Sequence, residues 1–228
     1  MNNMKSEHNR LWSEIAWKES EKIYEEIINH PFIKELADGT LSLDKYLGYL
    51  RQDRLYLREY SRVLANIASR LDNKDHSESF LRFSLESIHV EAQMHSFFLG
   101  KEQNFENDKM TTACALYTST LKSQSYSPVE VEAAAILPCF VVYLRVGKHI
   151  LSIVKDLENN PYKEWIKTYA DTTFEQSTKR AVEICDYLAE RSSESVREKM
   201  TKIFKECTRL EWLFWDSAWR LEKPLFND

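Results

Sequence analysis

Three side chains that could take part in one reaction lie on widely separated segments: Asp53, Cys139 and Glu211. A thiol attacks as its thiolate, and a free cysteine with a pKa of about 8.5 is mostly protonated at neutral pH, so it needs a base or a lowered pKa. No histidine lies beside Cys139 in the sequence, which makes a carboxylate such as Glu211 its natural proton partner. Asp53 is suited to accept hydrogen bonds from an amino group on a flat ligand. This combination predicts nucleophilic attack on an electron-poor aromatic ring.

The surroundings of Cys139 look more like those of a site than like ordinary packing. From Ala133 to Leu144 the chain is almost wholly apolar, which predicts a helix in the middle of a bundle. Pro138 falls inside that helix, where it removes a backbone donor at a cost of about 3 kcal/mol, so the distortion needs a reason. Tyr143 follows Cys139 by four residues and shares its face. The alternative is an inert core thiol, since cysteine is among the most buried residue types.

Asp53 stands in the middle of a helical stripe rich in tyrosine. Its members follow one another at steps of three and four: Tyr46, Tyr49, Asp53, Tyr56, Tyr60, Leu64 and Ile67. An ionised carboxylate in a buried stripe is costly unless it is hydrogen-bonded. Either Asp53 and the phenols contact a ligand, or the phenols satisfy the carboxylate as structure, or the stripe is partly wet.

Glu211 interrupts an apolar stripe of the last predicted helix. The stripe consists of Met200, Phe204, Cys207, Glu211, Trp215 and Ala218. Burial disfavours the charged form, so we expect a raised pKa, in the range useful for proton transfer near neutral pH. The alternative is a tilted stripe in which Glu211 reaches water. Asp216 lies on a different side and is expected to face solvent.

Tyrosines accompany the three groups and could sandwich a flat ligand by offset stacking. These are Tyr56, Tyr117, Tyr143 and Tyr169. All of these side chains must be positioned by long helices, because only four glycines and five prolines occur. We predict helices over about 7–29, 43–71, 76–100, a shorter one ending near 124, and then about 128–156, 160–169, 172–191 and 194–221. Residues 127–130 read as a capping box with proline at the first helical position. The sequence thus predicts one all-α domain over residues 1–228, a bundle of seven or eight helices.

The third predicted helix offers a different site. Its apolar stripe of Leu81, Leu85, Ile88, Ala92, His95 and Leu99 is expected to face the core, so that His95 is a core histidine. Glu86 and His89 match half of a di-iron bundle motif, which requires a second Glu-x-x-His and two further glutamates. No second Glu-x-x-His occurs in the sequence, so we predict no metal site.

The composition of the chain restricts which binding partners the protein can have. The net charge is −5 and no basic block occurs, so nucleic acid and anionic membranes are poor partners. No run approaches a membrane span, and the N-terminal residues lack the apolar core of a signal peptide. Cys114, Cys139, Cys185 and Cys207 are far apart, which argues against a zinc cage and for reduced thiols. We expect a cytoplasmic protein that binds a small molecule.

Taken together, these residues resemble the thiaminase II (TenA) family, which has a haem-oxygenase-like helical fold. The matching segments keep the family's order and approximate spacing from about residue 30 to residue 220. They are His30-Pro31-Phe32, Asp38-Gly39-Thr40-Leu41, Gln52-Asp53-x-x-Tyr56-Leu57, Tyr117-Thr118-Ser119, Leu137-Pro138-Cys139-x-x-x-Tyr143, Trp165-Ile166-x-x-Tyr169 and Glu211-x-x-Phe214-Trp215.

The resemblance implies an aminopyrimidine aminohydrolase of thiamin salvage. Members convert 4-amino-5-aminomethyl-2-methylpyrimidine to the hydroxymethyl pyrimidine, and many cleave thiamin slowly. Carried over by position, Cys139 would be the nucleophile, Glu211 would move protons to the ring and the leaving amine, and Asp53 would hold the ring and help activate the thiol. Tyr56, Tyr117, Tyr143 and Tyr169 would line the pocket. Such members are commonly homotetramers and need no metal or haem, and Cys139 places the chain in the cysteine-bearing branch.

Some residues depart from the family pattern. Leu210 and Trp212 flank Glu211 where tyrosines are expected, and residues 170–173 lack the glycine and tryptophan of some members. Either change could alter substrate preference. Two alternatives remain: an oxidase on the same fold of the kind that completes pyrroloquinoline quinone, and a non-catalytic ligand-binding or regulatory protein. The oxidase would require several histidines and arginines in its pocket. For a regulatory protein, the lack of a basic helix argues against direct DNA binding.

Overall fold

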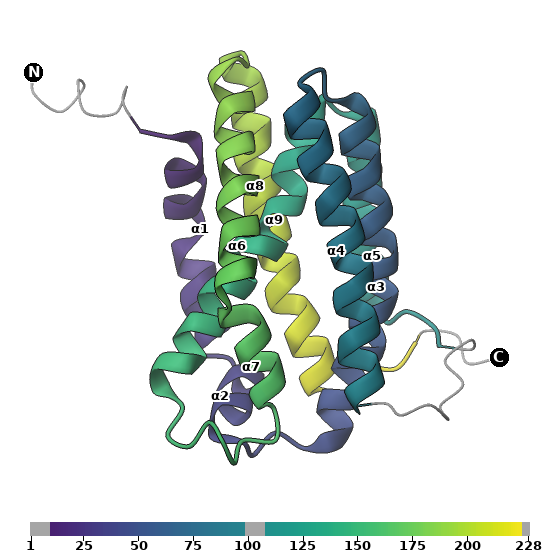
Figure 1. Ribbon diagram of the computed structural model, residues 1–228, viewed down its shortest axis with the longest axis vertical. Helices are drawn as coiled ribbons and strands as arrows, with labels where there is room; N and C mark the ends of the chain where they lie inside the picture. Colours follow the sequence, from purple (N-terminus) through teal and green to yellow (C-terminus); the bar gives the residue numbers. More distant parts are fainter. Residues whose placement is uncertain (1–9, 99–107, 225–228) are drawn as a thin grey trace, which may run out of the picture.

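Helix α6 (Val129–Ile153) forms the centre of the fold. A computed structural model of the chain describes residues 10–98 and 108–224, apart from the side chains of residues 90–98. In Figure 1 the long helices run side by side as a bundle, and α6 packs against helices on both sides of it. The other helices are α1 (Trp12–Ile28), α2 (Pro31–Asp38), α3 (Leu43–Arg70), α4 (Lys74–Phe98), α5 (Thr112–Ser123), α7 (Lys163–Ala170), α8 (Thr172–Glu190) and α9 (Glu194–Trp219), with a 3₁₀ turn at Gln124–Tyr126.

The central position of α6 follows from its composition. Its apolar residues are buried along almost the whole length, as expected for a helix without a polar face. The helix continues through Pro138, although this proline cannot donate to the carbonyl of Ala134. Two carbonyls near it accept side-chain donors instead: Ile136 accepts from Tyr60 Oη at 2.9 Å, and Ala133 from Cys185 Sγ at 3.6 Å. Neighbouring helices α3 and α8 therefore hold α6 around the proline.

Four other helices bring the candidate side chains to α6. Helices α3 and α4 form a hairpin along one side of the bundle (Figure 1), and α3 also contacts α5, α6 and α9. Helix α9 packs against α1, α3, α5 and α6, and α7 packs against α6. Residues far apart in the sequence therefore converge on one interior. None of the helices in the described part of the chain combines the length and apolarity that crossing a bilayer would need.

The fold class is all-α as predicted, but the described residues form nine α-helices rather than seven or eight. The additional helix is α2, where the sequence analysis saw only the end of the first helix. The proline that ends α1 also begins α2: Pro31 occupies the first helical turn, and the His30 ring accepts a hydrogen bond from the Phe32 N–H at 3.1 Å. The predicted capping box at residues 127–130 is also wrong, because Pro128 is the N-cap of α6 and Ser127 makes no cap bond.

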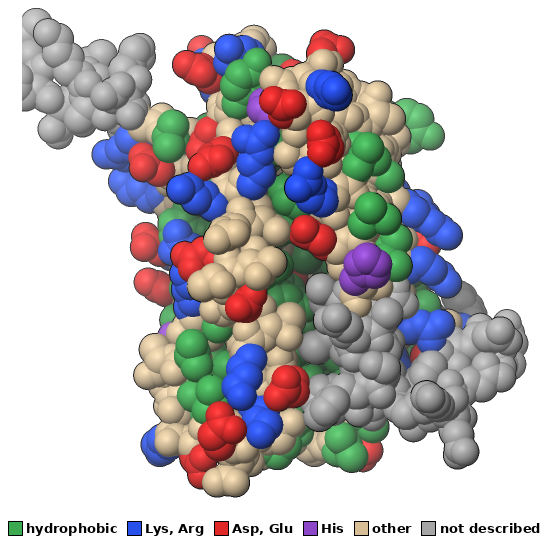
Figure 2. Space-filling model, viewed as in Figure 1, with side chains coloured by type: hydrophobic (Ala, Val, Ile, Leu, Met, Phe, Trp, Pro, Cys, Tyr) green, Lys and Arg blue, Asp and Glu red, His purple; other side chains and the backbone are tan. Residues whose placement is uncertain are grey.

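The described part of the apolar stripe predicted to face the core on α4, up to residue 88, faces solvent instead. Leu81, Leu85 and Ile88 are 49%, 58% and 45% exposed, and Figure 2 shows hydrophobic side chains along this side of the molecule. The buried side of α4 is aromatic: Phe80 and Phe83 pack inward, and the Phe83 ring lies 5.1 Å from that of Phe140.

This helix thus has two apolar sides, and the larger aromatic side chains occupy the core. The predicted core histidine, His95, lies outside the described side chains. Of the half di-iron motif, Glu86 accepts a hydrogen bond from Ser177 Oγ at 3.1 Å and His89 is exposed.

Candidate active site

Glu211 is buried at the contact of α9 with α5. Its side chain is 1% exposed, and Oε1 accepts a hydrogen bond from Tyr117 Oη at 2.7 Å. Burial raises the pKa of Glu211 to about 8, with a smaller contribution from the charge of Asp53, while the Tyr117 hydrogen bond acts in the opposite direction. Glu211 therefore carries its proton at neutral pH and can act as an acid.

Cys139 occupies the middle of α6, opposite α3. The residue is half-buried although Pro138 and Phe140 on either side of it are buried, so part of its surface remains accessible. Burial raises the pKa of Cys139 well above its ordinary value, and the charges of Glu211 and Asp53 raise it further. The thiol is therefore protonated at rest, and a base must remove its proton when it attacks.

Asp53 completes the set from α3, where it is 3% exposed. Besides burial, its negative charge contributes to the raised pKa values of Tyr49, Tyr143 and Glu211, which come from α3, α6 and α9. Because the charge of Asp53 acts on side chains from α3, α6 and α9, its carboxylate lies near the space where these three helices meet. The charges of Asp53 and Glu211 both act on the Cys139 thiol, so the three candidate groups border the same interior.

One aromatic wall of the site comes from α3 and α5. The Tyr56 ring stacks on that of Tyr60 at a centroid distance of 5.4 Å and lies 4.8 Å from that of Tyr117. The hydroxyls of Tyr56 and Tyr60 lie close enough to Cys139 to oppose the rise of its pKa. The Tyr56 hydroxyl is buried and forms no regular hydrogen bond within the described residues, so it remains available to a thiolate.

The opposite wall comes from α6 and α7 and is held by hydrogen bonds. Trp165 Nε1 donates to Tyr49 Oη at 3.2 Å, and Tyr49 Oη donates to Tyr143 Oη at 3.4 Å. The Tyr169 ring lies 4.8 Å from that of Tyr143 at an angle of 52°. All four predicted pocket tyrosines are therefore buried around the same interior.

The sequence analysis did not assign Tyr49, Tyr60 and Trp165 to the site, although the structure places all three beside it. Signals were present for each: Tyr49 and Tyr60 belong to the Asp53 stripe, and Trp165 precedes Tyr169 by one helical turn. A stripe alone does not show which of its members are in contact with the opposite helices.

The prediction that Asp216 faces solvent is wrong. Asp216 is 6% exposed, lies 3.3 Å from His30 Nε2 and pairs with Arg220. Because His30 Nδ1 accepts the Phe32 N–H, Nε2 carries the proton that is donated to Asp216. The pair joins the start of α2 to α9, and it is a structural connection outside the candidate site.

The residues that flank Glu211, Leu210 and Trp212, make contacts of their own. Trp212 packs edge-on against the His30 ring at 5.6 Å, on the side of α9 that faces α2. Leu210 is buried in the core. The two departures from the family pattern therefore leave the contact of Glu211 with Tyr117 intact.

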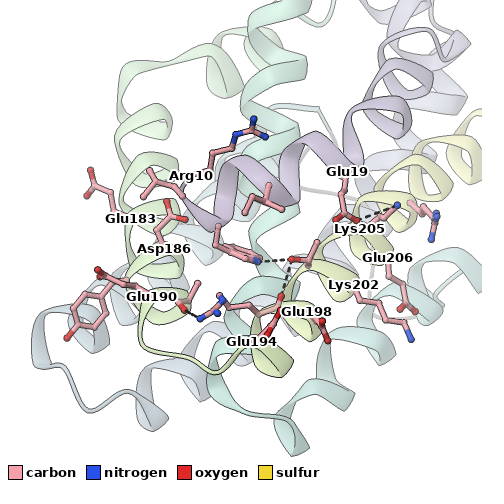
Figure 3. Close-up of a pocket in the computed structure, with 18 residues that line it drawn as sticks. Arg10, Glu19, Glu183, Asp186, Glu190, Glu194, Glu198, Lys202, Lys205 and Glu206 are labelled. Atoms are coloured by element: carbon pink, nitrogen blue, oxygen red, sulfur yellow. Dashed lines mark hydrogen bonds and ion pairs between the residues drawn. The ribbon is translucent and has the colours of Figure 1, made fainter. Parts of the chain in front are cut away.

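An open groove on the surface lies elsewhere, between α1, α8 and α9 (Figure 3). It encloses about 1410 Å³, and charged side chains such as Glu19, Asp186 and Lys205 line it. None of the candidate site residues belongs to this lining. Its open, mixed-charge surface differs from the buried, tyrosine-rich surroundings of Asp53, Cys139 and Glu211, so this groove is not the candidate active site.

The fold and the site together define the class of protein. The chain matches the TENA/THI-4/PQQC family over residues 17–221, and it belongs to this family. Its fold is haem-oxygenase-like: a domain from Shewanella denitrificans described with that fold has a TM-score of 0.71 at 14% identity, with 90% of each chain covered.

Several similar proteins carry more specific names. An aminopyrimidine aminohydrolase of Helicobacter pylori is 28% identical over 213 residues, covering 91% of this chain and 98% of that protein. One of Bacillus subtilis is 30% identical over 198 residues, with 85% and 83% covered. The solved structure of a TenA homologue from P. horikoshii OT3 has a TM-score of 0.82 at 26% identity, covering 92% of this chain and 99% of that one.

Proposed function

We propose that this protein is an aminopyrimidine aminohydrolase of thiamin salvage. It replaces the side-chain amino group of 4-amino-5-aminomethyl-2-methylpyrimidine by a hydroxyl and leaves the amino group on the ring in place. One observation carries the proposal: Cys139, half-buried on the central helix, is close enough to two buried carboxyl groups and two buried tyrosine hydroxyls for all four to act on its thiol. The names of the relatives from Helicobacter pylori and Bacillus subtilis support the same substrate class.

The first step is addition of the Cys139 sulfur to a ring carbon beside the one that bears the aminomethyl group. Because Glu211 holds its own proton at neutral pH, Asp53 is the carboxyl that accepts the thiol proton. The Tyr56 hydroxyl can then donate to the thiolate, whereas the proton of the neighbouring Tyr60 hydroxyl is donated to the Ile136 carbonyl. This agrees with the role that the family resemblance implies for Asp53, and it differs from the interpretation of the residues alone, in which Glu211 was the natural proton partner of the thiol.

The remaining steps exchange nitrogen for oxygen. Electrons of the adduct expel the side-chain amine as its carbon–nitrogen bond breaks, and Glu211 protonates that amine, leaving an exocyclic carbon–carbon double bond. Water adds to the exocyclic carbon and gives a proton back to Glu211. The carbon–sulfur bond then breaks, and the departing thiolate takes its proton back from Asp53. The net change is one water consumed and one ammonia released. Each role falls on a buried group, where acid–base catalysis and stabilisation of charge are strongest.

The test is ammonia release from the aminomethyl pyrimidine by the purified protein. We expect Cys139→Ser to abolish release while far-ultraviolet circular dichroism and the melting temperature stay near those of the natural protein. Cys185→Ser is the matched control, because Cys185 is a buried cysteine that bonds the same helix at Ala133, and it should keep its activity. Substantial turnover by Cys139→Ser would remove the proposed nucleophile.

We also propose that the protein acts as a homo-oligomer, in line with the tetramer implied by the family resemblance. The supporting feature is the outward apolar stripe of α4 formed by Leu81, Leu85 and Ile88. In a two-fold assembly the same stripe of two copies can bury itself. Leu85→Glu should lower the mass measured by light scattering, whereas Leu116→Glu, on an equally exposed leucine of α5, should not. An unchanged mass for Leu85→Glu contradicts the assignment of this surface.

A further inference from the structure

Gly147 lies inside α6, where a glycine costs about 1 kcal/mol relative to alanine. Its backbone does not have the left-handed conformation that would require glycine, unlike Gly39 with φ of 72°. Glycine is needed at residue 147 because there is no room for a side chain. A Cβ atom at residue 147 would lie 2.6 Å from the carbonyl carbon of Tyr169, 2.7 Å from its carbonyl oxygen and 2.9 Å from its Cβ.

These neighbours cannot move aside individually. Two of them are backbone atoms near the end of α7, so an added methyl group would have to displace the end of that helix. The missing side chain at Gly147 therefore allows α7 to make direct contact with α6. The residue at the contact is Tyr169, which belongs to the aromatic wall of the candidate site.

The geometry connects this contact to the chemistry. Cys139, Tyr143 and Gly147 follow one another at four-residue steps, so the sulfur, the phenol and the glycine share one face of α6. The Tyr169 ring is held 4.8 Å from that of Tyr143 and, on its outer side, 5.3 Å from that of Phe174. Burial raises the pKa of Tyr169 well above its ordinary value, and the charges of Tyr49, Asp53 and Cys139 raise it further.

We propose that Gly147 is a positioning residue, whose lack of a side chain sets how far Tyr169 reaches into the cavity and therefore how tightly a flat heteroaromatic ring is held. The inference rests on the proposed function and adds to it a residue that does not touch the substrate. Tyr169 is the group through which it acts. Because this wall holds the ring and takes no part in proton transfer, its displacement should affect binding more than the chemical step.

The test compares Gly147→Ala with Gly48→Ala. Gly48 also lies inside a long helix, but a Cβ there would meet only Leu221 Cδ2 at 3.7 Å, an ordinary contact. We expect Gly147→Ala to raise KM for the aminomethyl pyrimidine, and the Kd of the hydroxymethyl pyrimidine, at least about tenfold, with kcat changed less than about threefold. Gly48→Ala should change all three less than about twofold. Equal behaviour of the two variants, or a loss in kcat alone, overturns the proposal.

A double-mutant cycle shows whether Tyr169 transmits the effect. In a Tyr169→Ala background, Gly147→Ala should change Kd by less than about twofold, because the ring that it displaces is gone. An undiminished effect in that background refutes transmission through Tyr169. Should Gly147→Ala fail to fold, Phe174→Leu takes its place, because it frees the outer side of Tyr169 without a clash. It should raise KM more than it lowers kcat, and an unchanged KM would overturn the proposal.

The proposed function and the positioning role of Gly147 can be contradicted separately. A natural protein that neither binds the hydroxymethyl pyrimidine nor releases ammonia contradicts the proposed function. A natural protein that does both, but tolerates alanine at residue 147 as well as at residue 48, contradicts only the role of Gly147.

Discussion

Replacing Glu211 by glutamine should change how the stability of this protein depends on pH. In the unfolded chain the pKa of Glu211 is about 4.5, and burial raises it to about 8 in the folded state. Between these values folding must keep a proton on Glu211 that the unfolded chain has lost. One pH unit of such a difference corresponds to about 1.4 kcal/mol, so up to about 5 kcal/mol of unfolding free energy is involved.

The sign follows from the direction of the shift. Because the folded pKa is the higher one, this contribution is fully present below pH 4.5 and is lost as the pH rises toward about 8. Glutamine has the shape of the protonated acid and can still accept the hydrogen bond from Tyr117, but it does not titrate. The stability of the variant relative to the natural protein should therefore rise with pH, by up to about 1.4 kcal/mol per unit, and level off above pH 8.

Urea unfolding of both proteins at pH 5, 6, 7 and 8 measures this difference. All other titrating groups are common to both proteins, so their contributions largely cancel when one free energy is subtracted from the other. A difference that stays constant across this range, or that shifts in favour of the natural protein as the pH rises, would refute a protonated Glu211 in the folded state.

Three further outcomes follow from the same contacts. Ammonia release should fall as the pH rises through about 8, because Glu211 then loses the proton that the leaving amine needs; a rate that keeps rising above pH 9 would contradict this. Tyr117→Phe should move this upper limit to higher pH, because it removes the hydrogen bond that lowers the pKa of Glu211, and a limit moved downward would be the wrong sign. Arg70→Met should lower the unfolding free energy by about 3–5 kcal/mol, because it deprives the buried Glu132 of its ion pair. Arg82→Met removes an exposed ion pair and should cost about 0.5 kcal/mol or less. Equal losses for the two variants in denaturant unfolding would refute the distinction.

The interior of the bundle could be predicted from the sequence because periodicity reports which side of a helix is apolar. The unbroken apolar run around Cys139 correctly predicted a central helix, and the carboxylates of Asp53 and Glu211 were found because each interrupts such a stripe. A polar group on an apolar face is rare enough to be informative. These three residues come together because their helices all contact one another.

The errors arose where one pattern allowed two structures. Pro31 lies where α1 has ended and α2 begins, and the sequence analysis predicted no helix between about residues 29 and 43. On α4 the leucine stripe and the phenylalanine stripe satisfy the same periodicity, and only packing against Phe140 decides which is buried. Asp216 appeared to face solvent because its partner, His30, lies 186 residues away in the sequence. Such choices depend on tertiary contacts that a single stripe does not contain.

The phenols around the cavity give the protein an optical signature in alkaline solution. Burial raises the pKa of Tyr46, Tyr49, Tyr56, Tyr60, Tyr117, Tyr143 and Tyr169 above the ordinary value of 10. In the unfolded chain these side chains ionise at about pH 10, so their share of stability is present below that pH and disappears above it. Phenolate absorbance from these seven buried tyrosines should therefore appear abruptly, together with the loss of helical ellipticity.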